Sequence, residues 1–137
     1  MKRASELRLR RPAQSQYIAP IRHALAAFLE ALQVDRELRD DVTTAAGEAL
    51  ANVVEHAYAR SSGRAARSVQ LIARCKDGGK LLVDVSDQGS FIRRKPLPGR
   101  GFGLRIIRAI ARHISIDTSR GTCVSMTFEA RSAASKS

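Results

Sequence analysis

One pair of polar residues lies in a stretch of chain that is otherwise apolar. Glu48 and Asn52 are four positions apart in a segment with helical periodicity, so they are neighbours on one face of the expected helix. Residues 45–51 contribute four alanines and one glycine around them, which leaves room for a ligand to approach a carboxylate and an amide. The pair also fits an ordinary solvated helix face, which Asp41 and Glu55 would continue.

Two further polar residues follow from the two-residue period of β-strands. Residues 81, 83 and 85 are apolar, so Asp87 inherits their inward direction. Thr122 in the same way shares a face with the apolar positions 124, 126 and 128. An inward carboxylate needs a hydrogen-bond donor, which a ligand's amino group or the backbone could supply. Two such groups at strand ends indicate one polar pocket.

A third feature is the run of glycines that precedes an expected helix. Residues 99–104 read Gly-Arg-Gly-Phe-Gly-Leu, and a helix N-terminus behind glycines can bring backbone N–H groups against phosphate oxygens. Leu104 stands where a dinucleotide-binding fingerprint has its third glycine, and the Gly-Lys-Ser/Thr ending of a P-loop is missing. A flexible loop with simple helix capping explains the same residues.

Length, composition and charge limit the class of protein. The 137 residues suit one domain, residues 1–137, ordered over about 5–130 with a disordered tail at 131–137. Since the sequence has no apolar run of membrane length and no secretion signal, we expect a cytoplasmic protein. The net charge of +11 implies an anionic partner. Scattered bases and few aromatic residues disfavour nucleic acid as that partner.

The expected elements place the polar features on a sheet covered by helices. The order predicts an α+β two-layer sandwich, a mixed β-sheet with helices on one face. A loop at 59–66 and a long loop at 87–103, which holds Arg93, Arg94 and Lys95, separate these elements. The expected strands are 6–10, 69–75, 80–86, 114–118 and 122–129, and the expected helices are 18–32, 38–58 and 104–111.

Together and in this order, the features resemble the histidine-kinase-like ATPase superfamily, and within it the bacterial anti-sigma factor serine/threonine kinases. The N box of that branch resembles residues 48–52, continued by His-Ala-Tyr at 56–58. Its glycine boxes resemble Asp-Gln-Gly at 87–89 and Gly-Phe-Gly-Leu at 101–104, and its last motif resembles Gly-Thr at 121–122. The resemblance covers about residues 5–130.

The resemblance implies an ATP- and Mg²⁺-binding site. By analogy, Asn52 would coordinate Mg²⁺ through its amide oxygen, Asp87 would accept a hydrogen bond from the adenine amino group, and Glu48 would act as the catalytic base. Arg22 matches an arginine that contacts partners in relatives. The implied ATP-binding residues are Asn52, Asp87, Gly89, Arg100, Gly101, Phe102, Gly103, Leu104 and Thr122.

The resemblance also implies a function in partner switching. The chain would be a protein serine kinase that binds a sigma factor, phosphorylates a STAS-type antagonist and forms a homodimer. Ser90 and Phe91 replace the second glycine that is common in the larger superfamily, and the ATP lid is short. An inert ATP-binding sequestration module and a basic nucleic-acid-binding domain are the alternatives.

Overall fold

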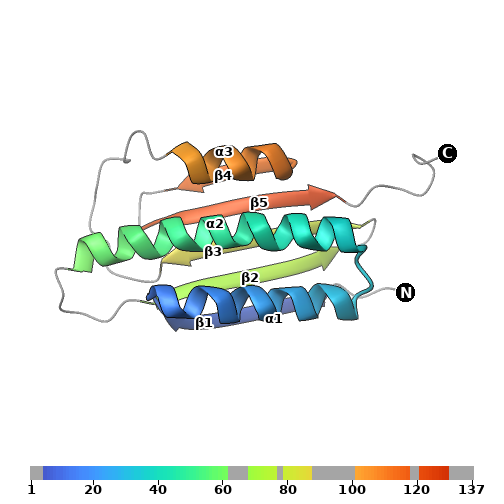
Figure 1. Cartoon of the computed structure of the whole chain (residues 1–137), viewed down its shortest axis with the longest axis horizontal. Coiled ribbons are helices and arrows are strands. Elements are labelled where there is room, and N and C mark those ends of the chain that lie inside the picture. Colours follow the sequence, from blue (N-terminus) through green and yellow to red (C-terminus); the bar gives the residue numbers. More distant parts are fainter. Residues whose placement is uncertain (1–4, 62–67, 77–78, 88–100, 118–120, 130–137) are drawn as a thin grey trace.

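Helices cover one face of a five-stranded sheet (Figure 1). The computed structural model describes residues 5–61, 68–76, 79–87, 101–117 and 121–129. This arrangement confirms the predicted α+β two-layer class. The predicted tail at 131–137 and most of the predicted loop at 87–103 lie outside the described residues. The elements are β1 Ser5–Pro12, a 3-10 turn Ser15–Tyr17, α1 Ile18–Ala31, α2 Arg36–Ser61, β2 Ser68–Lys76, β3 Lys80–Asp87, α3 Gly101–Ile110, β4 His113–Asp117 and β5 Cys123–Glu129.

The strands follow the order β1-β2-β3-β5-β4 across the sheet. Every hydrogen-bonded pair among the described strands is antiparallel, which differs from the mixed sheet expected from the sequence. The reason lies in the crossover through α3. Strands β3 and β4 run in the same direction, but β5 folds back and inserts between them, so the two parallel strands never pair.

The core forms where the apolar faces of the two layers meet. The alternating strand pattern places residues 81, 83 and 85 of β3 and residues 124, 126 and 128 of β5 inward, and all six are buried. Helix α1 contributes Ile21, Leu25 and Leu29, and α3 contributes Ile107. Helix α2 lies over the middle of the sheet (Figure 1). This packing fixes α2 above the end of β3, where the candidate site lies.

The turn between α1 and α2 is defined by hydrogen bonds at both helix ends. Gln33 has a φ of 63°, and its N–H donates to Glu30 O at 2.9 Å while Val34 N–H donates to Leu29 O at 3.0 Å, a Schellman closure of α1. Asp35 then caps α2, since its Oδ1 accepts from Glu37 N–H at 3.1 Å. The predicted loop at 59–66 is wrong in its first three residues, because α2 continues to Ser61.

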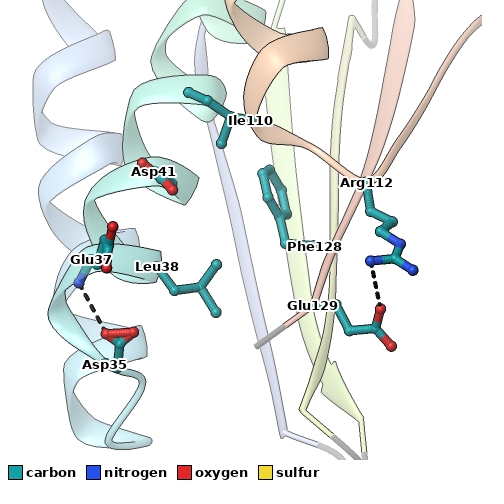
Figure 2. Close-up of a pocket in the computed structure, with 8 residues that line it drawn as sticks. All are labelled: Asp35, Glu37, Leu38, Asp41, Ile110, Arg112, Phe128 and Glu129. Atoms are coloured by element: carbon teal, nitrogen blue, oxygen red, sulfur yellow. Dashed lines mark hydrogen bonds and ion pairs between the residues drawn. The ribbon is translucent and has the colours of Figure 1, made fainter. Parts of the chain in front are cut away.

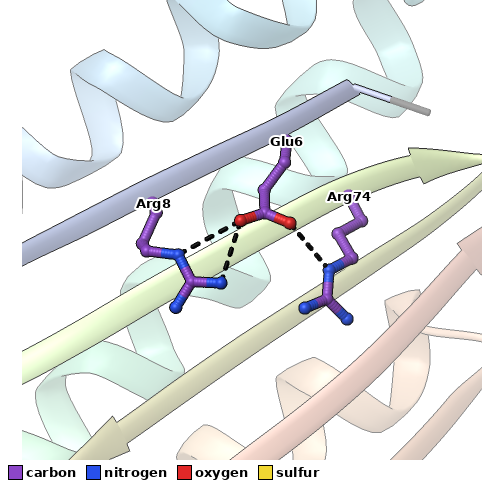
Figure 3. Close-up of polar contacts among 3 residues, drawn as sticks. All are labelled: Glu6, Arg8 and Arg74. Atoms are coloured by element: carbon purple, nitrogen blue, oxygen red, sulfur yellow. Dashed lines mark hydrogen bonds and ion pairs between the residues drawn. The ribbon is translucent and has the colours of Figure 1, made fainter. Parts of the chain in front are cut away.

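The sheet face away from the helices carries charged residues at its β1 edge (Figure 3). Glu6 accepts hydrogen bonds from Arg8 at 2.9 and 3.1 Å and from Arg74 at 3.1 Å. Arg74 and Arg8 thereby lower the pKa of the Glu6 carboxyl below its ordinary value.

Among the described residues, no helix is long and apolar enough to cross a membrane.

Candidate functional site

The ends of two neighbouring strands hold a buried polar pair. Asp87 closes β3 with 5% of its surface exposed, and Thr122 precedes β5 with 3% exposed. The Asp87 N–H donates to Thr122 O at 2.8 Å, which ties the two strand ends together. The predicted inward direction of both residues is therefore confirmed. A carboxylate and a hydroxyl at one buried corner can select a ligand that donates hydrogen bonds.

Gly121 makes this corner possible. Its φ of 91° lies in the region that favours glycine. A Cβ added there would stand 3.1 Å from the carbonyl oxygen of Asp87 and 3.5 Å from its Oδ2. The backbone of residue 121 thus approaches Asp87 closely, and a side chain at this position would crowd the carbonyl oxygen of Asp87 and contact its carboxylate.

Helix α2 supplies the other polar pair. Glu48 and Asn52 are both half-buried, and neither belongs to the stripe of α2 residues that is buried in the core. The small residues around them do not all leave open space, however, because Ala45, Ala46 and Ala49 are fully buried. Their small size allows α2 to pack closely on the sheet. The open space beside Glu48 is instead a pocket that Gly47 and Ala51 line together with Glu48.

The elements that carry most of the described predicted site residues meet at one end of the molecule. Figure 1 shows the C-terminal half of α2, the end of β3, the start of β5 and the start of α3 at this end. Helix α3 begins at Gly101, so the predicted glycine-rich helix opening over Gly101, Phe102, Gly103 and Leu104 is confirmed for the backbone. Gly89 and Arg100 lie outside the described residues. The roles predicted for these residues remain predictions.

A pocket of about 410 Å³ lies between α1 and α2, directly beside Glu48. Arg22 of α1 crosses α2 over Gly47, and a Cβ at Gly47 would approach Arg22 Cδ to 2.7 Å. The glycine therefore seats the arginine against the helix that carries Glu48. The pocket is lined by Ile18, Arg22, Thr43, Thr44, Gly47, Glu48 and Ala51.

Sequence reasoning did not predict the pocket that Gly47 and Thr43 line together with Arg22 and Glu48. Glycine inside a helix is unfavourable by about 1 kcal/mol relative to alanine. Gly47 within the periodic stretch was therefore the one sequence feature that indicated a close contact on this helix. Thr43 gave no such signal in the sequence. In the structure its hydroxyl donates to the carbonyls of Arg39 and Asp40 within the helix.

The described residues contain no cluster of three or more His, Cys, Asp or Glu side chains that could hold a metal ion. The donor expected for Mg²⁺ is the amide oxygen of Asn52, and an amide oxygen suits this hard cation, which takes most of its other ligands from phosphates and water beside a nucleotide. The buried carboxylate of Asp87, next to the close backbone of Gly121, likewise fits an adenine amino group.

The sequence matches the histidine kinase-like ATPase domain family over residues 11–128. The protein belongs to this family. It is 29% identical over 143 residues to proteins named serine-protein kinase RsbW from Bacillus thuringiensis (strain Al Hakam) and Bacillus anthracis (strain CDC 684 / NRRL 3495), covering 93% of this chain and 86% of each relative.

Two solved structures share the fold at lower sequence identity. The RsbU and RsbW domains of Rv1364c from Mycobacterium tuberculosis match with a TM-score of 0.70 and 20% identity, over 92% of this chain and 32% of that one. This chain therefore spans about a third of that longer protein. The SiaB-SiaC complex from Pseudomonas aeruginosa matches with a TM-score of 0.64 and 18% identity, over 89% of this chain and 87% of that one.

Proposed function

We propose that the protein is an ATP-dependent protein serine kinase that phosphorylates a small antagonist protein and sequesters a sigma factor in a partner-switching system. The observation that carries the proposal is the placement of Glu48 on α2, half-buried and beside a pocket that Arg22 also lines. The match to RsbW kinases along nearly the whole chain supports serine as the phosphate acceptor.

The nucleotide binds at the strand-end corner and reaches towards α2. Asp87 accepts a hydrogen bond from the adenine amino group, Thr122 supports the same end of the base, and Gly89 allows backbone to approach it. Gly101 and Gly103 present backbone N–H groups to the phosphates at the positive end of the α3 dipole. Arg100, Phe102 and Leu104 complete this end of the site. Asn52 would hold Mg²⁺, which would supply neutralising charge for the phosphates.

Glu48 acts as the catalytic base. Its carboxylate accepts the proton of the substrate serine as the serine oxygen bonds to the γ-phosphorus and the bond from that phosphorus to the β–γ bridging oxygen breaks. ADP leaves with the bridging oxygen. The pocket beside Glu48 has the size to admit a serine side chain with its flanking backbone. Positioning and charge stabilisation provide most of the acceleration, and the base contributes about 100- to 10,000-fold.

Partner proteins dock on the side of α1 and α2 that carries Arg22. Arg22 is exposed and held next to the catalytic base by Gly47, so a partner that contacts this arginine also meets Glu48. We assign this surface to a STAS-type antagonist and to a sigma factor, and we expect the kinase to form a homodimer. The fold shared with a chain of the SiaB-SiaC complex is compatible with a protein partner.

Phosphate transfer from ATP labelled at the γ-position to purified STAS-type candidate antagonists tests the proposal. Glu48→Ala should lower the transfer rate at least about 100-fold while ATP binding persists. Glu30→Ala, which removes an exposed carboxylate at the far end of α1, is the matched control and should leave the rate unchanged. Wild-type ATP binding without transfer to any candidate would instead identify an inert sequestration module.

A further inference from the structure

A second pocket lies far from the nucleotide site, at the end of the molecule where α2 begins and β5 ends. It has a volume of about 170 Å³ and lies between α2, α3 and β5. Figure 2 shows Leu38 pointing from α2 towards Phe128 of β5, with Ile110 of α3 above them. Phe128 is buried and the other two are half-buried, so the floor of the pocket is apolar.

The rim of this pocket is acidic in a strongly basic chain. Asp35, Glu37 and Asp41 follow one another along the first turns of α2, and Glu129 stands on the opposite side (Figure 2). Arg112 is the only basic residue among the described residues that line the pocket, and it pairs with Glu129 at 3.4 Å. The lining therefore carries a formal charge of −3, whereas the whole chain carries +11.

The acidic side of the rim is partly fixed before any ligand arrives. Asp35 Oδ1 accepts the N–H of Glu37 at 3.1 Å as the cap of α2, which holds this carboxylate in place. Asp41 is exposed one turn further along the same helix and also lines the pocket. Carboxylates above an apolar floor complement a side chain that has an aliphatic stem and a cationic head.

We propose that this pocket binds an arginine side chain presented by a segment of a partner protein. A volume near 170 Å³ suits a single large side chain, since an apolar cavity of about 150 Å³ holds one benzene molecule. The aliphatic stem would lie on Leu38, Ile110 and Phe128, and the planar guanidinium would pair with the carboxylates of α2. A guanidinium is more weakly hydrated than an ammonium and fits carboxylates in a bidentate manner, which favours arginine over lysine.

Other occupants of the pocket are less compatible with its lining. The described residues hold no metal-binding cluster here, so a simple cation is disfavoured. A basic residue of one copy that entered the pocket of the next copy would make a head-to-tail contact, which does not close into the homodimer expected above. A partner protein with a single exposed arginine on a neutral or acidic surface would complement the acidic rim of the pocket and would not be repelled by the basic chain around it. This site is independent of the nucleotide site.

An NMR titration of the full chain with N-acetyl-arginine amide tests the proposal. The amide signals of residues 37–41, 110–112 and 128–129 should shift saturably, with a dissociation constant in the millimolar range expected for one side chain. N-acetyl-citrulline amide has nearly the same shape without the charge and should produce much smaller shifts. Asp41→Asn should weaken binding about two- to fivefold, the effect of losing one exposed ion pair.

Asp40→Asn is the matched control. It removes the same charge from the neighbouring position, which does not line the pocket, and should leave the arginine titration unchanged. Equal shifts with citrulline, shifts centred elsewhere, or equal effects of the two variants would overturn the proposal. The same signals moving with protein concentration, in the absence of the probe, would assign the pocket to a second copy and also overturn it.

Discussion

Gly121 offers the sharpest test of the adenine corner. Replacing it with alanine forces an L-residue into a φ of 91°, which costs about 1–2 kcal/mol in backbone strain. The new Cβ would also stand 3.1 Å from Asp87 O, a contact that requires the neighbouring strand end to shift by a few tenths of an ångström. We expect Gly121→Ala to lower the free energy of unfolding by about 1–3 kcal/mol.

The same shift displaces the carboxylate that is proposed to recognise adenine. A hydrogen bond to a charged group contributes about 1.5–3 kcal/mol, which corresponds to about 10- to 100-fold in affinity when it is lost completely. Partial displacement of Asp87 should therefore weaken ATP binding by at least about threefold and by up to about 100-fold. Isothermal titration calorimetry measures the affinity, and urea unfolding measures the stability.

Gly79→Ala separates the two effects. Gly79 also has a positive φ, 80°, but it lies in the turn between β2 and β3, at the opposite end of β3 from Asp87. The control should therefore lose a similar amount of stability and retain its affinity for ATP. If Gly121→Ala binds ATP as tightly as Gly79→Ala does, the assignment of this corner to adenine is refuted.

Two further predictions concern Arg22 and Glu6. Gly47→Ala should displace Arg22 from α2 and weaken antagonist binding in calorimetry, while the better helix propensity of alanine offsets the crowding and keeps the melting temperature near that of the wild type. Unchanged antagonist affinity would contradict the docking role of Arg22. Because Arg74 and Arg8 lower the pKa of Glu6, its stabilising effect exists above the unfolded pKa near 4.5 and is lost as pH falls through the folded value. Glu6→Gln should therefore melt slightly below wild type at pH 7, and the gap in melting temperature should narrow in thermal scans as the pH is lowered below 4.5; a gap that does not change with pH contradicts this.

Periodicity was sufficient to predict the layers of the fold. The inward positions of β3 and β5 follow from strict alternation, and this alternation also placed Asp87 and Thr122 at the buried corner. The order of the strands is not local information. Nothing in residues 113–117 or 123–129 by themselves shows that β5 inserts beside β3, so the all-antiparallel pairing needed the structure.

Helical spacing was sufficient to place Glu48 and Asn52 together on α2, whereas their catalytic and Mg²⁺-binding roles remain predictions. The contact of Arg22 with Gly47 was not predictable, because it depends on how α1 crosses α2. The acidic pocket was also not predictable, since Glu129 is far along the chain from Asp35 and Asp41, and all three are ordinary exposed residues in the sequence. Helix α2 extends three residues into the predicted loop, because the helix propensity of Ala59 and Arg60 outweighs that of the serine at its end.

The proposed kinase requires a Mg²⁺-dependent ATP site that includes Asn52 of α2. Calorimetric titration of the purified protein with ATP, with and without Mg²⁺, and again with Asn52→Ala, tests it most directly. We predict binding that requires Mg²⁺ and is lost in Asn52→Ala, while the Gly79→Ala control binds as the wild type does. Absence of ATP binding by the wild-type protein, or Mg²⁺-independent binding that Asn52→Ala retains, would contradict the account.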